Sequence, residues 1–176
     1  MLLQHPTYTD HYYNTHTQKV IKIRTLKSGE QKMKVKKLVL NQNGYQSFKV
    51  HLGKGKYKFF SAHRFIAECC AHRVLDSEEH IDHIDQNPLN NELSNLRIVN
   101  RTINLLNSDK GQGYCYIPAA KPTHRDRYQC WFRSVYQATF DTAEEAQAHY
   151  NKLKQACLEA ELDGVLTLKE MIEEVA

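Results

Sequence analysis

The chain has 176 residues, a formal net charge of +4 and 41% hydrophobic residues. This length suits one medium domain or two small ones, and the hydrophobic content excludes disorder over the whole length. No run of about 18 uncharged apolar residues is present. The first residues also lack the basic and apolar regions of a signal peptide. We therefore expect a cytoplasmic protein with no membrane partner.

Formal charge is unevenly distributed along the chain. From Asp141 onward there are nine acidic and three basic residues, a net of −6, so residues 1–140 carry +10. This excess favours a polyanionic partner such as nucleic acid. Charge alone leaves the question open, because many solvated protein faces are basic.

The first predicted elements are strands. Residues 16–60 alternate between apolar and polar side chains in four segments (19–26, 34–40, 45–52 and 56–60) separated by turn signals, which predicts a small antiparallel sheet. In the third segment Phe48, Val50 and Leu52 share one face, which we expect to pack. The other face is basic, and its candidate DNA contacts are Lys22, Arg24, Lys34, Lys36 and Lys49. The alternative is a solubilising face whose lysines protect the sheet edges.

Residues 62–72 follow as a predicted helix. Ser61 can cap its N-terminus, and an apolar stripe of Phe65, Ile66, Cys69 and Cys70 should pack on the sheet. The five cysteines include no CxxC clip and are odd in number, so we expect reduced packing residues and no structural zinc.

The segment 80–108 concentrates polar residues that can support chemistry. "HIDHI" and "LRIV" read as short strands around an Asn-rich loop, and Asn100 can cap a helix that contains Asn104. In such a unit the oxygens of Asp82 and Asn104 could hold one hard divalent cation. The imidazole of His83 could then deprotonate a water, with the amide oxygen of Asn95 accepting its other N–H. The plainer interpretation is a surface Asp-His pair beside turn-forming asparagines, among them Asn87, Asn90 and Asn91.

The run "HIDHIDQNPLNNELSNLRIVNRTIN" resembles the HNH endonuclease motif, in the Asn-rich variant of phage and intron-encoded homing endonucleases and nickases. Asn43-Gly44-Tyr45 and "AHRFIA" extend the resemblance over roughly residues 16–108. It implies that His83 is the general base, that Asp82 and Asn104 bind Mg²⁺, for which Mn²⁺ can substitute, and that Asn95 orients His83. Gln86 stands where the family usually has glycine. The extra His80 is expected to be a bystander, because strand alternation puts it opposite His83.

The remaining segments form a second pattern. Residues 109–112 resemble a linker, and residues 113–160 predict three strands followed by a helix with a Thr142–Glu145 capping box. "FDTAEEA" makes this part similar to AP2-type DNA-binding domains. Further candidate DNA contacts are Arg97 and Arg101 near the motif, and Arg127, Trp131 and Arg133, although Trp131 could equally be a packing residue. Residues 161–176 predict a short acidic helix.

Together these patterns predict an α+β protein. It would have an HNH domain at 1–108, comprising an N-terminal sheet, a helix and a ββα-metal unit, and a C-terminal AP2-like domain at 113–160. The expected function is a metal-dependent endonuclease or nickase of double-stranded DNA that leaves 5′-phosphate and 3′-hydroxyl ends, acting as a monomer or as a dimer. The alternative is a non-catalytic sequence-specific DNA-binding regulator with a remnant HNH fold.

Overall fold

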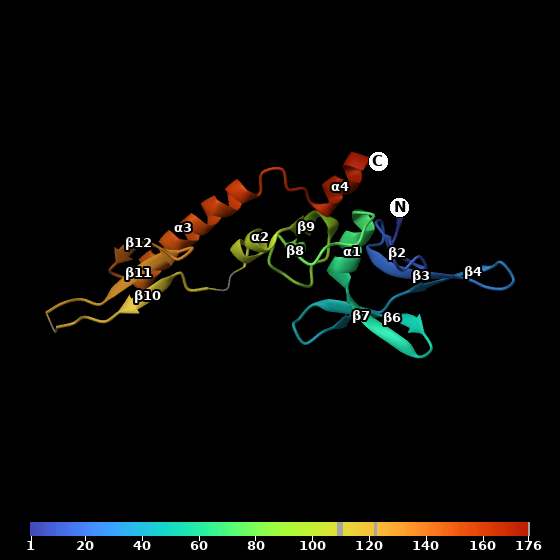
Figure 1. Ribbon diagram of the computed structural model, residues 1–176, viewed down its shortest axis with the longest axis horizontal. Coiled ribbons are helices and arrows are strands. Elements are labelled where there is room, and N and C mark those ends of the chain that lie inside the picture. The colour runs from blue at the N-terminus through green and yellow to red at the C-terminus, as the bar shows by residue number, and fades with distance from the viewer. Residues whose placement is uncertain (109–110, 122, 176) are drawn as a thin grey trace. The chain divides into compact units, whose positions relative to one another are not determined.

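The computed structural model describes residues 1–108, 111–121 and 123–175 (Figure 1). By its internal contacts the chain divides into two units, one formed by Met1–Arg101 with Val165–Ala176 and the other by Thr102–Gly164. The expected linker at 109–112 falls within the second range, and its first two residues, Asp109 and Lys110, lie outside the described residues. Both units mix helices with small antiparallel sheets, in agreement with the predicted α+β class.

The first unit begins with two antiparallel sheets. One has the strand order β1 (Leu2–Gln4), β2 (His11–Asn14), β3 (Lys19–Thr25) and β4 (Gln31–Val35), and the other has the order β5 (Val39–Leu40), β6 (Gln46–Gly53) and β7 (Lys56–Ser61). The single sheet expected over residues 16–60 is therefore wrong. Residues 34–40 were expected to form one strand, but the chain leaves the first ladder after Val35 and joins the second at Val39, and a period of two does not reveal where one sheet ends.

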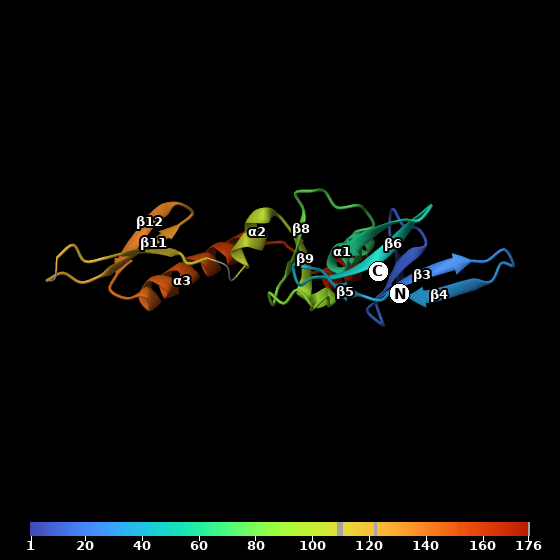
Figure 2. The ribbon, with the colours of Figure 1, turned by 90° about the horizontal axis from the view of Figure 1, so that it is seen from below.

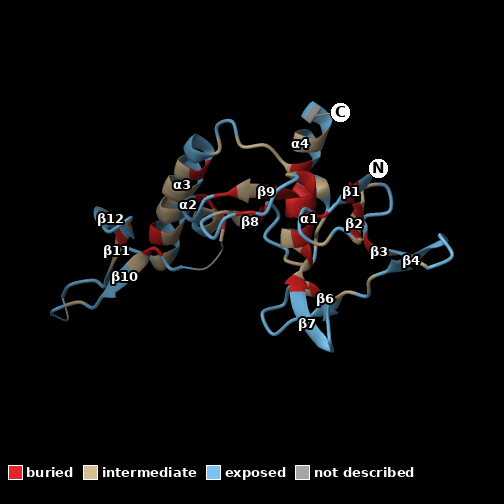
Figure 3. Cartoon of the chain, turned by 45° about the vertical axis from the view of Figure 1, so that its right-hand side comes forward, coloured by how far each residue is buried: buried red, intermediate tan, exposed pale blue. Residues whose placement is uncertain are grey.

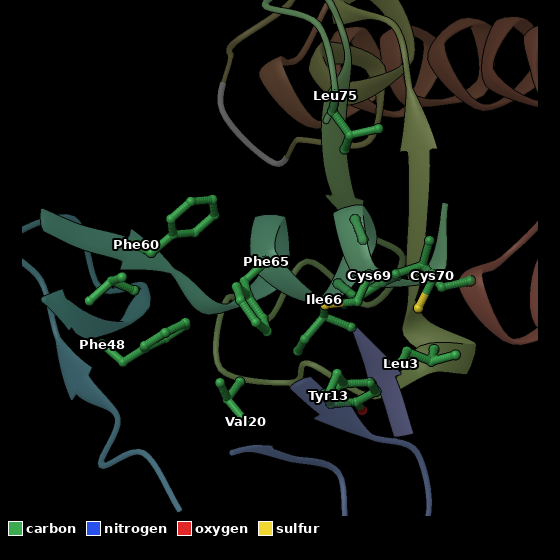
Figure 4. Packing of buried hydrophobic residues seen from close by; sticks show 14 residues of the cluster. Leu3, Tyr13, Val20, Phe48, Phe60, Phe65, Ile66, Cys69, Cys70 and Leu75 are labelled. Atoms are coloured by element: carbon green, nitrogen blue, oxygen red, sulfur yellow. The ribbon is translucent and has the colours of Figure 1, made fainter. Parts of the chain in front are cut away.

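The core of this unit surrounds helix α1 (Ala62–Cys70). Figure 4 shows Phe65 and Ile66 of α1 among side chains from both sheets, and Phe65 meets the ring of Phe48 edge-on at 5.0 Å. The predicted apolar stripe of the helix is buried as expected, which Figure 3 shows in red. Leu52 is 53% exposed, in contrast to the prediction, and Ser61 occupies the N-cap position without a side-chain capping bond.

The strand, strand and helix predicted after residue 80 are present. Strand β8 (His80–His83) pairs antiparallel with β9 (Leu96–Val99), the short 3-10 helix η1 (Leu93–Asn95) lies between them in the chain, and α2 (Arg101–Leu106) follows. Helix α4 (Leu168–Val175) returns to the first unit. Its Leu168 is fully buried in the core, and Thr167 forms a β-bridge with Arg97. The acidic tail is therefore a structural part of this unit.

The second unit contains a three-stranded sheet of β10 (Tyr114–Ile117), β11 (Arg127–Phe132) and β12 (Val135–Phe140), against which α3 (Ala143–Glu161) packs (Figure 2). The Thr142–Glu145 capping box is present as predicted. Gly113 lies so close to Tyr150 of α3 that an added Cβ would be 1.8 Å from a ring carbon. Only glycine fits at this position.

All five cysteines are free thiols, and Cys69, Cys70 and Cys130 are buried packing residues. Among the described helices, none has the length and apolar character needed to cross a membrane.

Candidate functional site

The pairing of β8 with β9 places a buried ion pair at the centre of the candidate site. Asp82 lies directly opposite Arg97 in the antiparallel register. The Arg97 Nη2 and Nε atoms lie 2.7 Å and 2.9 Å from Asp82 Oδ2, and both side chains are less than 10% exposed. A buried carboxylate requires such a partner, because an unpaired charge in the interior is strongly unfavourable.

The next residue, His83, is buried and held by a chain of carboxamides. Its Nε2 atom lies 3.2 Å from Asn91 Oδ1, and Asn91 Nδ2 donates to Gln46 Oε1 at 2.9 Å. The imidazole also contacts the rings of His63 and Tyr45, with centroid distances of 5.4 Å and 6.1 Å. Residues from β6, α1 and the β8–β9 loop thus restrict the orientation of one imidazole.

The side-chain hydrogen bonds of Asn95 lie within the β8–β9 loop. Its Oδ1 accepts from the backbone N–H of Asp85 at 3.0 Å, and its Nδ2 donates to Asp85 Oδ1 and to the carbonyl of Asn90. The sequence predicts that Asn95 orients His83. In the structure it is the side chain of Asn91 that lies within hydrogen-bond distance of the His83 ring. Hence Asn91 is more than the turn-former that we expected.

The rest of the loop supports this arrangement. Hydrogen bonds from Asn90, and then from the backbone of Asn87, lower the pKa of Asp85. Gln86 has a φ of 61°, a left-handed conformation that glycine adopts most easily. This explains why glycine would suit the position.

Two neighbours on α1 complete the surroundings. Burial, together with the charges of His83 and Arg64, lowers the pKa of His63 to about 4, so this imidazole is neutral at neutral pH. Arg64 donates to Glu68 and to backbone carbonyls of the segment that leads into β8, those of Leu75, Asp76 and Glu79. These bonds fix the start of β8 relative to α1.

The donor chemistry fits a hard divalent cation. Asp82, in the first unit, has a buried carboxylate, and Asn104 lies on α2 in the range of the second unit. Carboxylate and carboxamide oxygens are ligands that such a cation takes. Among the residues that the structure describes, no three His, Cys, Asp or Glu side chains come together as a metal cluster.

The basic residues of the N-terminal sheets gather on the β3–β4 hairpin. Lys22 lies directly opposite Lys34, and Arg24 opposite Lys32. A groove of about 830 Å³ runs along these residues, and it is also lined by Asp10, Leu26, Met33, Lys36, His51 and Gly53. Burial, followed by the charges of Lys22 and Lys34, lowers the pKa of Lys36. The groove is therefore a concentrated positive site.

The remaining candidate DNA contacts up to residue 101 differ in exposure and in their neighbours. The Lys49 ammonium lies 3.8 Å from the centre of the Tyr57 ring. Arg97 is buried in its pair with Asp82, and Arg101 is exposed at the start of α2. Arg97 therefore stabilises Asp82, and its buried guanidinium has little surface with which to contact a ligand.

In the second unit, two of the three candidates are ion-paired. Arg127 bonds to Asp141, and Arg133, in the β11–β12 turn with a φ of 50°, lies 3.2 Å from Glu161. Trp131 is 41% exposed and meets Tyr136 edge-on at 5.7 Å. The side chains of Arg127 and Arg133 are 51% and 49% exposed, so all three candidates lie on the surface.

Sequence reasoning missed Gln46, His63 and the role of Asn91. Gln46 lies 45 residues from Asn91 in the chain, so no local pattern links them. For Asn91 the density of asparagine was a usable signal, since the loop contains more carboxamides than its turns require.

The comparisons with known proteins agree with this location. Residues 61–106 match the family model of the HNH endonucleases. No curated protein matches the chain. A solved structure described as "DNA binding and cleavage by the HNH homing endonuclease I-HmuI" is similar at 27% identity and a TM-score of 0.46, over 61% of this chain and 56% of that one.

The chain thus spans little more than half the length of that protein. The family match includes α1, both strands of the β8–β9 pair and the whole of α2. Over residues 61–106 the chain is therefore similar to the HNH endonucleases.

Proposed function

We propose that the protein is a magnesium-dependent endonuclease that hydrolyses one phosphodiester of double-stranded DNA. The observation that carries this proposal is the adjacency of a buried carboxylate, Asp82, and an oriented imidazole, His83, on β8 within the segment that matches the HNH endonucleases. Carboxylate and imidazole are the groups needed to hold a hard cation and to remove a proton from water.

In this mechanism His83 accepts the proton of the attacking water. The water oxygen bonds to phosphorus, the bond from phosphorus to the 3′ oxygen breaks, and that oxygen takes up a proton, which leaves 5′-phosphate and 3′-hydroxyl ends. Asp82 and Asn104 are the proposed ligands of Mg²⁺ or Mn²⁺. When bound, the cation would stabilise the negative charge that develops on the phosphate and the leaving oxygen.

The substrate would be held by surfaces outside this centre. The basic β3–β4 hairpin suits the phosphate backbone, whose binding gains from counterion release. We further propose that the sheet of residues 113–160 is an AP2-like DNA-binding module that presents Trp131. One centre per chain implies nicking by the monomer, with a double-strand break requiring a second binding event or a dimer.

Relaxation of supercoiled plasmid in the presence of Mg²⁺ tests the proposal. Wild type should convert the plasmid to nicked circles that DNA ligase reseals, which would establish the proposed end chemistry. His83→Ala should lower the nicking rate about 10²- to 10⁴-fold, the usual contribution of a general base, while DNA affinity changes only a few-fold. His80→Ala, on the same strand, is the matched control and should nick as wild type does.

Two results would contradict this function. A wild-type protein that retards DNA in a gel and relaxes no plasmid with Mg²⁺ or Mn²⁺ would be a DNA-binding regulator. An equal loss of cleavage and affinity in His83→Ala would show that His83 serves binding or folding.

A further inference from the structure

We infer that Gln46 is a positioning residue for the nuclease centre: acting through Asn91, it fixes the tautomer of His83 that carries its proton on Nε2. This inference deepens the proposed function and rests on it for its catalytic meaning. It assigns a role to β6, the strand that brings Gln46 and Tyr45 to the site from a distant part of the sequence.

The directions of the hydrogen bonds lead to the tautomer. Gln46 Oε1 is only an acceptor, so the Asn91 atom facing it at 2.9 Å must be the donor Nδ2. Asn91 Oδ1 is then the atom that faces His83 Nε2 at 3.2 Å, and an acceptor there requires an N–H on the ring. Reversing the tautomer would require both carboxamides to turn over together.

The rings of His63 and Tyr45 pack against the His83 imidazole and keep it in the orientation in which Nε2 faces Asn91 Oδ1. His63 meets His83 nearly perpendicular, at an interplanar angle of 73°, and Tyr45 contacts both histidines. Because His83 is itself only 6% exposed, rotation of its ring would displace at least one of these neighbours. The tautomer and the ring orientation are thus set by the same set of residues.

The chemical consequence concerns the nitrogen that acts as base. With the proton on Nε2, the lone pair of the neutral ring lies on Nδ1, which is therefore the atom that takes the proton from water. The ring then becomes a cation, and its Nε2–H bond to Asn91 becomes charge-assisted and stronger. Gln46 and Asn91 consequently stabilise the imidazolium that forms during hydrolysis.

Nicking kinetics provide the first part of the test. Asn91→Leu should lower kcat about 10- to 100-fold and Gln46→Leu about 10-fold, with KM within about two-fold, as is typical for residues that orient a functional side chain. Asn91→Asp keeps an acceptor beside Nε2 and should retain most of kcat. Gln42→Leu replaces an exposed glutamine in the turn before β6 and is the matched control.

The second part is independent of activity. In uniformly ¹⁵N-labelled protein without DNA, at mildly alkaline pH, the ring shifts of His83, identified by their absence in His83→Gln, should be those of the Nε2–H tautomer. In Asn91→Leu and Gln46→Leu they should move toward a mixture of tautomers. These spectra also report whether each variant keeps the fold.

The outcomes separate the two proposals. If wild type nicks DNA but His83 is the Nδ1–H tautomer, or if Gln46→Leu leaves both kcat and the spectrum unchanged, the inference is wrong and the proposed function stands. If wild type shows the Nε2–H tautomer and does not nick under any metal condition, the proposed function fails and the structural part of the inference stands.

Discussion

In the first unit the Asp82 and Arg97 side chains of an ion pair are 5% and 9% exposed, whereas in the second unit the paired Arg127 and Asp141 side chains are 51% and 53% exposed. The first unit encloses this pair beside a cluster of fourteen buried residues. The second unit packs one helix on one small sheet and leaves its ion pairs in water. The contrast shows that an ion pair is enclosed where a sufficient core excludes water around it.

The largest effect should come from removing one partner of the enclosed pair. Arg97→Ala leaves the Asp82 carboxylate buried without its guanidinium, which should lower the free energy of unfolding by about 3–5 kcal/mol. Arg127→Ala removes the same type of side chain from the exposed pair and should cost less than about 1 kcal/mol. Amide hydrogen exchange of β6 reports the first unit, and fluorescence of Trp131, the one tryptophan of the chain, reports the second. Similar costs in the two variants would contradict the contrast.

Acid should weaken the first unit through His63. Its pKa is about 4 in the folded chain, against 6.5 as the ordinary value, mainly because burial disfavours the charged ring. Since the folded pKa is the lower one, the unfolded chain takes up the proton first. The stabilisation is therefore complete above pH 6.5 and is lost as pH falls toward 4.

The measured loss should be on the order of 2 kcal/mol, seen as faster exchange of β6 amides after correction for the intrinsic rate. His63→Phe keeps a ring beside His83 and should remove most of this dependence. If the variant weakens with acid as much as wild type does, other groups are responsible, for example His11, whose pKa burial also lowers.

A smaller effect is expected from overpacking the second unit. Gly113→Ala places a methyl group 1.8 Å from a carbon of the Tyr150 ring, and the displacement of α3 should cost about 1–3 kcal/mol. The unfolding transition followed by Trp131 fluorescence should move toward lower stability, while hydrogen exchange of the β6 amides stays unchanged. The double variant Gly113→Ala with Tyr150→Ala removes the clash, so its cost should be less than the sum of the two single costs.

The smallest change in stability should come from the β3–β4 hairpin, where like charges face each other. Lys34→Gln relieves the repulsion between Lys34 and Lys22 and should stabilise the first unit by about 0.2–1 kcal/mol. If the hairpin binds phosphates as proposed, the same change should lower the slope of log affinity against log salt by about one. An unchanged slope would remove Lys34 from the DNA contacts. Gln42→Ala, in an exposed turn, serves as the neutral comparison.

The sequence was most informative where one local pattern determines one element. The stripe on α1, the β8–β9 pair and the capping box of α3 all followed from spacing or from a capping signature. The adjacency of Asp82 and His83 was likewise visible, since both residues lie on one short strand. Their roles as metal ligand and base stay predictions.

Features that depend on distant segments could not be predicted. Asn91 meets Gln46 across 45 residues, and Arg97 meets Asp82 only because of the register of the β8–β9 pair. The division of the N-terminal strands into two sheets was missed for the same reason, because alternation is a property of single strands and not of their partners. The return of α4 to the first unit likewise has no local signal.

That return has a consequence for synthesis of the protein on the ribosome. Leu168 fills the core that surrounds α1, and Thr167 extends the ladder at Arg97, yet both are translated after every residue of the intervening unit. A nascent chain that already carries Asp82 and His83 therefore still has an open core beside them. Completion of the proposed nuclease centre is thereby delayed until translation has passed the module proposed to select the DNA.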